Sequence, residues 1–182
     1  DMPFAAYLFL GAAMTAPSPG TLSWSRLLKA ASPLDGSHPR PTADDLALLQ
    51  YTGGTTGAPK GAMLSHRNLR SNAAQGRAWM PGLQDGREVV YAVLPLFHAY
   101  GLTLCLTFTI SIGAVLVLFP RFDVDQVLEA SQRRPATFLP AVPPVYQALA
   151  EAAVARGVGL RTIRYGISGA MSLPPATVEQ WE

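Results

Sequence analysis

The sequence predicts an α/β fold, in which a parallel β-sheet carries helices on both faces. Three observations indicate this fold. From Asp44 onward, short strand-like apolar runs alternate with helix-like runs, a pattern typical of βα units. Apolar residues make up 49% of the 182-residue chain, which is enough to fill a substantial core. Several of the boundaries between runs carry residues that begin or end helices.

The predicted elements follow one another over the C-terminal three quarters of the chain. Strands are expected over residues 46–51, 88–96, 114–119, 136–142 and 162–168. Helices are expected over residues 65–80, 101–110, 124–134 and 143–157. Ser65 and Asp123 are predicted N-caps, and Gly157 is predicted to end the helix before it.

The first part of the chain is rich in proline and shows little periodicity. A short amphipathic helix is expected at residues 23–31, SWSRLLKAA. We therefore divide the chain into a poorly defined lead-in segment, residues 1–41, and a main domain over residues 42–182.

Charge and cysteine content limit the classes of function that this chain could have. Charged residues are 14% of the chain, well below the roughly 25% typical of soluble domains, so we expect much of the surface to be covered by further protein. A net charge of +2 without runs of like charge predicts no nucleic-acid partner. Cys105 is the single cysteine, which excludes an internal disulfide and favours a reducing, cytoplasmic setting.

One uncharged stretch has the length of a minimal membrane-spanning helix. It covers residues 102–119, but threonine, serine and glycine interrupt it, and its last residues form a strand-like run ended by Pro120. We expect a helix followed by a buried strand. An integral membrane protein is the disfavoured alternative. Residues 4–13 are apolar but lack a basic flank, so no signal peptide is predicted.

The stretch YTGGTTGAPKG, residues 51–61, holds four glycines, three threonines and one lysine in eleven residues. We expect it between a strand and a helix, at the carboxyl end of a parallel strand, where open α/β sheets bind ligands. Glycine allows backbone N–H groups to approach an anion closely, while threonine hydroxyls and lysine add donors and charge. The pattern predicts a cradle for a polyphosphate, formed by Thr52, Gly53, Gly54, Thr55, Thr56, Gly57 and Lys60.

This loop is not an ordinary P-loop. In the P-loop pattern GxxxxGK[ST], the lysine follows a glycine and precedes the serine or threonine that binds magnesium. Here Lys60 follows Pro59 and precedes Gly61, so that hydroxyl is missing.

Three motifs resemble the adenylate-forming enzymes, which include acyl-CoA synthetases, peptide-synthetase adenylation domains and luciferases. LQYTGGTTGAPKGAMLSHRNL, residues 49–69, resembles their phosphate-loop signature. LPLFHAYGL, residues 94–102, is similar to their acyl-pocket motif, and ISGAMSLP, residues 167–174, to the segment that lines the adenine and acyl sites. The resemblance implies that residues 42–182 are a partial AMP-binding (adenylation) domain, part of the large N-terminal domain of such an enzyme.

Within this family the sequence looks most like long- and medium-chain fatty-acyl-CoA synthetases. The implied reaction is attack of a fatty-acid carboxylate on the α-phosphate of MgATP, followed by displacement of AMP by coenzyme A. The implied catalytic residues are Lys60, Thr55 and His98, with His98 orienting the substrate. The implied acyl and adenine pocket consists of His98, Tyr100, Gly101, Leu102, Tyr146, Ser168, Gly169 and Ala170.

The resemblance also sets the expected partners. The expected cofactors are ATP, Mg²⁺ and coenzyme A, and the magnesium ligand is expected beyond Glu182, with none assigned within these residues. The chain is expected to be an internal fragment with little or no activity alone. Its expected partners are its small substrates and the N- and C-terminal parts of the same enzyme. Peripheral contact with a membrane is left open.

Two alternatives remain at this stage. The first is an adenylating enzyme for aryl or amino acids, although peptide-synthetase domains usually carry serine where Gly53 stands. The second is a non-catalytic nucleotide-binding module that keeps the loop without the chemistry.

Overall fold

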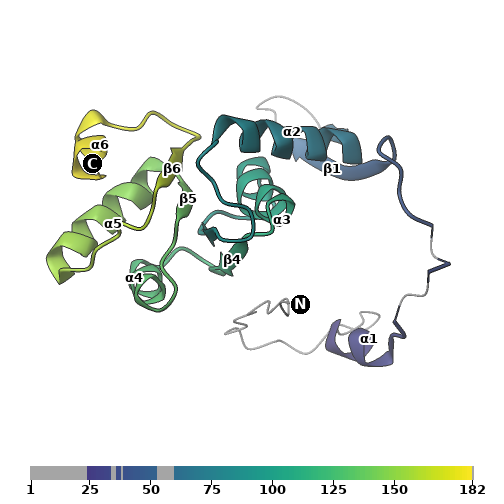
Figure 1. The fold of residues 1–182 in the computed structure, drawn as a ribbon, viewed down its shortest axis with the longest axis horizontal. Helices are drawn as coiled ribbons and strands as arrows, with labels where there is room; N and C mark the ends of the chain where they lie inside the picture. Colours follow the sequence, from purple (N-terminus) through teal and green to yellow (C-terminus); the bar gives the residue numbers. More distant parts are fainter. Residues whose placement is uncertain (1–23, 34–35, 38, 53–59, 182) are drawn as a thin grey trace.

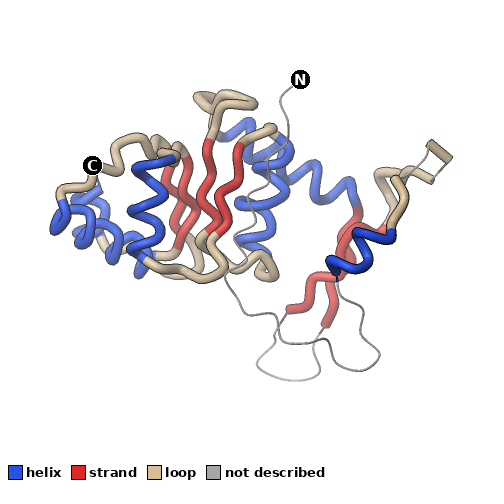
Figure 2. The backbone as a smooth tube through the Cα atoms, turned by 90° about the horizontal axis from the view of Figure 1, so that it is seen from below, coloured by secondary structure: helices blue, strands red, loops and turns tan. Residues whose placement is uncertain are grey.

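The computed structural model describes residues 24–33, 36–37, 39–52 and 60–181, and its centre is a four-stranded parallel sheet between helices (Figures 1 and 2). The strand order is β4, β3, β5, β6. The strands are β3 (Val89–Ala92), β4 (Val115–Leu118), β5 (Phe138–Ala141) and β6 (Tyr165–Ser168). The predicted fold class is confirmed, and each predicted run between residues 88 and 168 contains its strand or helix.

The two middle strands are buried on both faces, and their side chains alternate between two cores. Val90 and Phe138 face one core, whereas Tyr91 and Leu139 face the other. The first core is covered by α2 (His66–Trp79) and α3 (Phe108–Ser111), where Phe108 packs edge-to-face on Phe138 at 5.9 Å between ring centroids. The second is covered by α4 (Val124–Arg133) and α5 (Pro143–Arg156).

The predicted helix boundaries are confirmed. Ser65 accepts a hydrogen bond from the Asn68 N–H, and the Asn68 side chain accepts one from the Ser65 N–H, which completes a capping box. The Asp123 carboxylate accepts from the Gln126 N–H at 3.0 Å. Gly157 ends α5 in the left-handed conformation, with φ of 64°, which glycine adopts without steric cost.

The predicted place of the glycine loop is wrong. Its flanking segments, β1 (Leu46–Thr52) and β2 (Lys60–Ser65), pair antiparallel with each other in a separate two-stranded sheet. The loop therefore connects the strands of a hairpin and does not follow a parallel strand directly. The sequence reasoning missed β2 because its short run, KGAMLS, was assigned to the loop and the helix cap. Figure 2 shows the hairpin apart from the four-stranded sheet, and α2 follows β2 directly.

Residues 102–119 form a helical segment and then a strand, as expected. The helical part differs in type, because Gly101–Thr107 forms a π-helix, η1, before α3. In the part of the chain that the structure describes, no helix combines the length and apolar character needed to cross a bilayer.

Two short helices complete the described chain. The predicted N-terminal helix is present as α1 (Trp24–Ala30), which lies away from the sheet in Figure 1. The second, α6 (Pro175–Trp181), packs against α5, where the Trp181 indole N–H donates to the Tyr146 carbonyl at 3.0 Å. The division of the chain at residue 41 stays a prediction.

A buried carboxylate connects the amino ends of three strands. Glu88 is 1% exposed and accepts hydrogen bonds from the Thr137 hydroxyl at 2.5 Å, the Gln84 N–H at 2.6 Å and the Arg164 guanidinium at 2.6 Å. Burial alone would raise the pKa of Glu88, but these three donors outweigh it and hold that pKa below its ordinary value. The strands β3, β5 and β6 are thus joined through one ionised side chain.

We expect Glu88→Gln to lower the free energy of unfolding by about 2–3 kcal/mol at neutral pH, because it leaves buried donors without an ionised acceptor. A lowered folded-state pKa means that this stabilisation is present above the unfolded-state pKa of about 4.3 and is lost as pH falls. Urea unfolding of the wild type and the variant from pH 7 downward should therefore give curves that converge in acid.

The matched control is Glu129→Gln, which removes an exposed helix-surface pair with Arg133. Such pairs contribute about 0.3–0.5 kcal/mol. Equal effects of the two substitutions would show that the Glu88 contacts do not stabilise the sheet.

Candidate active site

The predicted pocket residues gather at the carboxyl edge of the sheet. The chain leaves β3 through residues 94–100, β5 through Val142, and β6 through residues 169–174. Because carboxyl ends of parallel strands meet at one edge, segments distant in sequence become neighbours there. The structure thus brings residues 98–102 next to residues 167–170, as the interactions of Tyr100 demonstrate.

Tyr100 connects the ends of β5 and β6. Its hydroxyl lies 2.5 Å from the Ile167 carbonyl oxygen and 3.2 Å from that of Ala141. Burial raises the pKa of Tyr100 to about 12, so the phenol stays protonated and acts as a donor at neutral pH. The ring lies against Gly169, where an added Cβ would be only 3.0 Å from ring carbons.

His98 is exposed and lies two residues before Tyr100. Its Nδ1 accepts a hydrogen bond from the Tyr100 backbone N–H at 3.2 Å. In the neutral imidazole this contact places the proton on Nε2, which then serves as a donor. Such a donor suits the orientation of an anionic or carbonyl oxygen better than proton abstraction.

Gly101 begins η1 where the backbone approaches itself closely. A Cβ at this position would lie 2.3 Å from the Pro95 carbonyl oxygen. A side-chain rotation could not relieve this contact, because the oxygen belongs to the backbone. Gly101 is buried at this close approach. Its neighbour Leu102 borders the cavity beside the hairpin.

The segment after β6 combines an unpaired hydroxyl with a strained backbone. The buried Ser168 Oγ has no hydrogen-bond partner among the described residues. Ala170 has φ of 69°, in the left-handed region that disfavours side chains. Ser168 also borders a cavity of about 320 Å³ between β6, α5 and α6. An unpaired buried hydroxyl is a group that a ligand could satisfy.

Tyr146 belongs to the core beneath this segment. It is 5% exposed, and its hydroxyl lies 2.5 Å from the Leu139 carbonyl oxygen and 3.1 Å from that of Ile167. Its ring packs edge-to-face on Trp181 at 5.1 Å. Tyr146 thus supports the strand ends and also borders the 320 Å³ cavity.

The ends of the glycine loop are joined by the hairpin. Thr52 and Lys60 face each other in the register, and the Thr52 hydroxyl lies 3.3 Å from the Lys60 carbonyl oxygen. Lys60 is exposed. The other predicted phosphate-binding residues lie outside the described residues: Gly53, Gly54, Thr55, Thr56 and Gly57.

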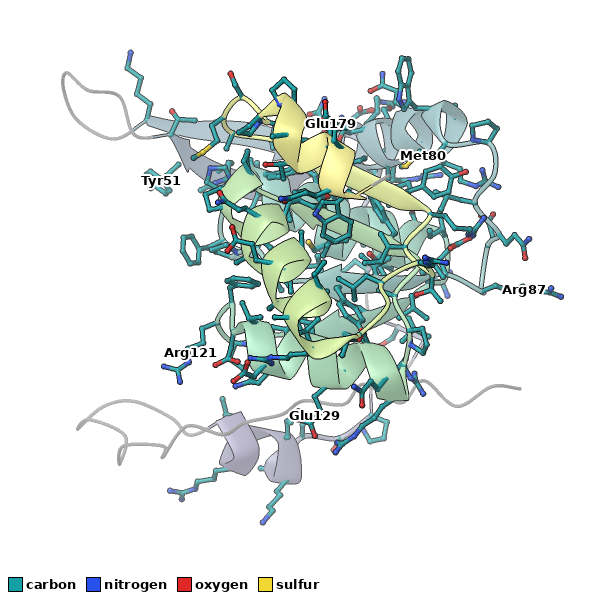
Figure 3. The ribbon with its side chains drawn as sticks, turned by 90° about the vertical axis from the view of Figure 1, so that its left-hand side faces the viewer. Tyr51, Met80, Arg87, Arg121, Glu129 and Glu179 are labelled. Carbon is teal, nitrogen blue, oxygen red and sulfur yellow. The ribbon has the colours of Figure 1, made fainter. Side chains whose placement is uncertain are left out.

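Gln50 connects the hairpin to the histidine segment and was missed in the sequence analysis. Its side-chain amide donates to the Phe97 carbonyl at 3.3 Å, next to His98. A cavity of about 400 Å³ lies beside this contact, lined mainly by apolar residues of β1 and of residues 96–102. The available signal was one amide within the apolar run LALLQY. Tyr51, 64% exposed, extends from the same strand at the molecule's outer side (Figure 3).

No metal site is apparent in the described part of the chain. Residues 24–33, 36–37, 39–52 and 60–181 contain no group of three histidine, cysteine, aspartate or glutamate side chains placed to hold an ion.

The comparison with known families identifies the class of protein. The sequence profile of the AMP-binding enzyme family matches residues 11–182. The chain belongs to this family of adenylate-forming ligases, and its sheet with flanking helices is part of their large N-terminal domain.

Two curated relatives are CoA ligases that are named for different acids. The chain is 38% identical over 138 residues to a long-chain-fatty-acid–CoA ligase of Bacillus subtilis, covering 76% of this chain and 25% of that protein. It is 37% identical over 146 residues to 4-coumarate–CoA ligase 1 of Oryza sativa, covering 77% and 26%. The chain thus spans about a quarter of the length of these relatives.

Solved structures give the same assignment of the fold. The N-terminal domain of FACL13 from Mycobacterium tuberculosis, crystallised with an inhibitor, has a TM-score of 0.75 at 26% identity, over 86% of this chain and 38% of that one. O-succinylbenzoate coenzyme A synthetase of Bacillus subtilis, in complex with AMP, also has a TM-score of 0.75, at 29% identity over 88% and 32%.

We expect Gly101→Ala to destabilise the protein by about 2 kcal/mol or more, because the added methyl group overlaps the Pro95 carbonyl. Gly159→Ala is the control, since a Cβ there meets nothing within 4 Å, and we expect its effect to stay within about 0.5 kcal/mol. Thermal unfolding monitored by circular dichroism measures both. A Gly101→Ala variant as stable as the Gly159→Ala variant would contradict the close approach.

We expect Ser168→Ala to stabilise the ligand-free protein by about 1 kcal/mol, because it removes a buried hydroxyl that has no partner among the residues the structure describes. Ser131→Ala should have the opposite sign, because the Ser131 hydroxyl donates to the Leu128 carbonyl at 2.7 Å. Urea denaturation measures both signs. Destabilisation by both substitutions would mean that Ser168 does have a partner.

Proposed function

We propose that the protein containing this chain activates a fatty acid with ATP and transfers the acyl group to coenzyme A. The observation that carries this proposal is the meeting of residues 98–102 and 167–170 at one edge of the sheet, in a chain of the AMP-binding enzyme family. The relatives' names support a CoA ligase, and the fatty-acid ligases among them support the acid.

The residues suit a nucleotide bound beside the sheet edge. Lys60 carries an exposed charge at the end of the hairpin, and the loop residues Thr55 and Thr56 supply hydroxyls for the β- and γ-phosphates. The Ser168 hydroxyl, which no other described residue satisfies, lies beside Gly169 and Ala170 and supplies a donor or acceptor for the nucleotide or the acid. Mg²⁺ bound with ATP would neutralise phosphate charge, and we assign it no ligand within these residues.

The proposed roles of these residues are to position the substrates and to stabilise the charge that develops during the reaction. The ionised acid carries no proton to remove, so its oxygen needs only the correct distance and direction to the α-phosphate. His98, through its Nε2 donor, would orient the carboxylate, and Lys60 would stabilise the charge that gathers on pyrophosphate as it leaves. Coenzyme A then attacks the activated carbonyl, and AMP departs.

The 400 Å³ apolar cavity favours a fatty acid as the substrate. It is lined by Leu48, Leu49 and Phe97, among others, and it borders the segment that carries His98. An aryl acid is the second candidate, because one relative is named for 4-coumarate and one neighbour for o-succinylbenzoate. The proposal includes a cytoplasmic location for the enzyme. Peripheral contact with a membrane is compatible with it.

The test is exchange of pyrophosphate into ATP by the full-length protein that contains this chain. The acids compared are acetate, octanoate, palmitate, benzoate, 4-coumarate and a few amino acids. We expect exchange that depends on a fatty acid and falls about 100-fold or more in Lys60→Ala and Thr55→Ala, because each removes a group that stabilises transferred charge. Lys29→Ala, in the exposed helix α1, is the control and should leave exchange unchanged.

Each outcome has one meaning. Exchange with aryl acids but not with fatty acids would show that the substrate is an aryl acid, the second candidate. AMP binding that is sensitive to Lys60→Ala, without exchange on any acid, would identify a non-catalytic nucleotide-binding module.

A further inference from the structure

Two tyrosine hydroxyls approach the same main-chain carbonyl from different elements. The Ile167 oxygen lies 2.5 Å from the Tyr100 hydroxyl and 3.1 Å from the Tyr146 hydroxyl. Each hydroxyl has a single proton. The shorter contact of Tyr146 goes to Leu139, inside β5, at 2.5 Å, whereas the shorter contact of Tyr100 goes to Ile167, next to the end of β6. Tyr100 is therefore the tyrosine that holds the chain where it leaves the sheet.

The segment held in this way is strained. Ala170, three residues after Ile167, has φ of 69° and is the one non-glycine residue with positive φ among those described. A left-handed alanine is less stable than one in the usual conformation and persists only where its surroundings enforce it. Between these positions, Gly169 rests on the Tyr100 ring so closely that a Cβ would be 3.0 Å from it.

We propose that Tyr100 is a positioning residue, whose hydroxyl and ring hold residues 167–170 in their strained conformation so that Ser168, Gly169 and Ala170 face the bound substrates. Tyr100 acts through the main chain of this segment. Its hydroxyl is occupied by the Ile167 and Ala141 carbonyls, so it neither donates to substrate nor transfers a proton.

Tyr100 also hydrogen-bonds to the other half of the site. The Tyr100 N–H donates to His98 Nδ1, while the Tyr100 hydroxyl donates to Ile167. One residue thus contacts both halves of the site, the histidine through its main chain and residues 167–170 through its side chain. This inference rests on the proposed function for its catalytic consequence, but the structural coupling is testable without activity.

The experiment measures Tyr100→Phe in two backgrounds of the full-length protein, the wild type and Ala170→Gly. Tyr100→Phe keeps the ring and removes only the hydroxyl. Glycine accepts positive φ without strain, so the segment should keep its conformation in the Ala170→Gly background even without the hydroxyl. The matched control is Tyr91→Phe, which removes the hydrogen bond from a buried hydroxyl to the Arg134 carbonyl, away from this edge.

The first readout is fatty-acid-dependent pyrophosphate exchange, with kcat and KM for the acid measured per folded enzyme. We expect Tyr100→Phe to lower kcat/KM about tenfold in the wild type and not more than about threefold in the Ala170→Gly background. Tyr91→Phe should have the same effect in both backgrounds. Loss of general stability alone would not produce a rescue confined to Tyr100.

The second readout is the thermal unfolding midpoint, which needs no activity. Tyr100→Phe should lower the midpoint more in the Ala170→Gly background than in the wild type, because in the wild type the released segment recovers the strain of Ala170 and offsets part of the lost hydrogen bond. Tyr91→Phe should lower it equally in both. Absence of exchange in the wild type would refute the proposed function, and the midpoints would still decide the coupling. Equal effects of Tyr100→Phe in both backgrounds, or no effect in either, would overturn the inference.

Discussion

The burial of β3 and β5 on both faces is the constraint on which the rest of the structure depends. Val90 and Phe138 face one core, and Tyr91 and Leu139 face the other, so neither strand has a face available to water. Strands of this kind need helices on both sides and parallel neighbours that are reached by crossovers. Once the strands run in parallel, the segments that leave them meet at the carboxyl edge, which is where the candidate site lies.

The two edges of the sheet are built differently. At the amino edge, Glu88 has three hydrogen-bond donors, and its charge is fully compensated within the fold. At the carboxyl edge, the Ser168 hydroxyl is buried without a hydrogen-bond partner in the described part of the chain, and Ala170 is strained. Unsatisfied groups and strain cost stability, so they persist where they serve binding and where the remaining structure supplies the free energy.

The hairpin of β1 and β2 depends on its surroundings more than the sheet does. A two-stranded hairpin is marginally stable alone, and this one leaves Leu49, Tyr51 and Met63 from 49% to 71% exposed. Its described contacts are with α2 and, through Gln50, with the Phe97 carbonyl. The hairpin thereby connects the glycine-rich stretch to the histidine segment, although their motifs are separated along the chain.

The sequence by itself determined the parallel sheet, the strands from β3 onward, the helix caps at Ser65, Asp123 and Gly157, and the family, because these follow from local periodicity, capping chemistry and motif residues. It did not determine the antiparallel pairing of β1 with β2, since KGAMLS is too short to show a period. The π-helical turn at Gly101 and the hydrogen bonds of the Tyr100 hydroxyl were also not predicted. A carbonyl at residue 167 and a hydroxyl at residue 100 become partners only when the sheet brings its carboxyl ends together, and only the tertiary structure decides that contact.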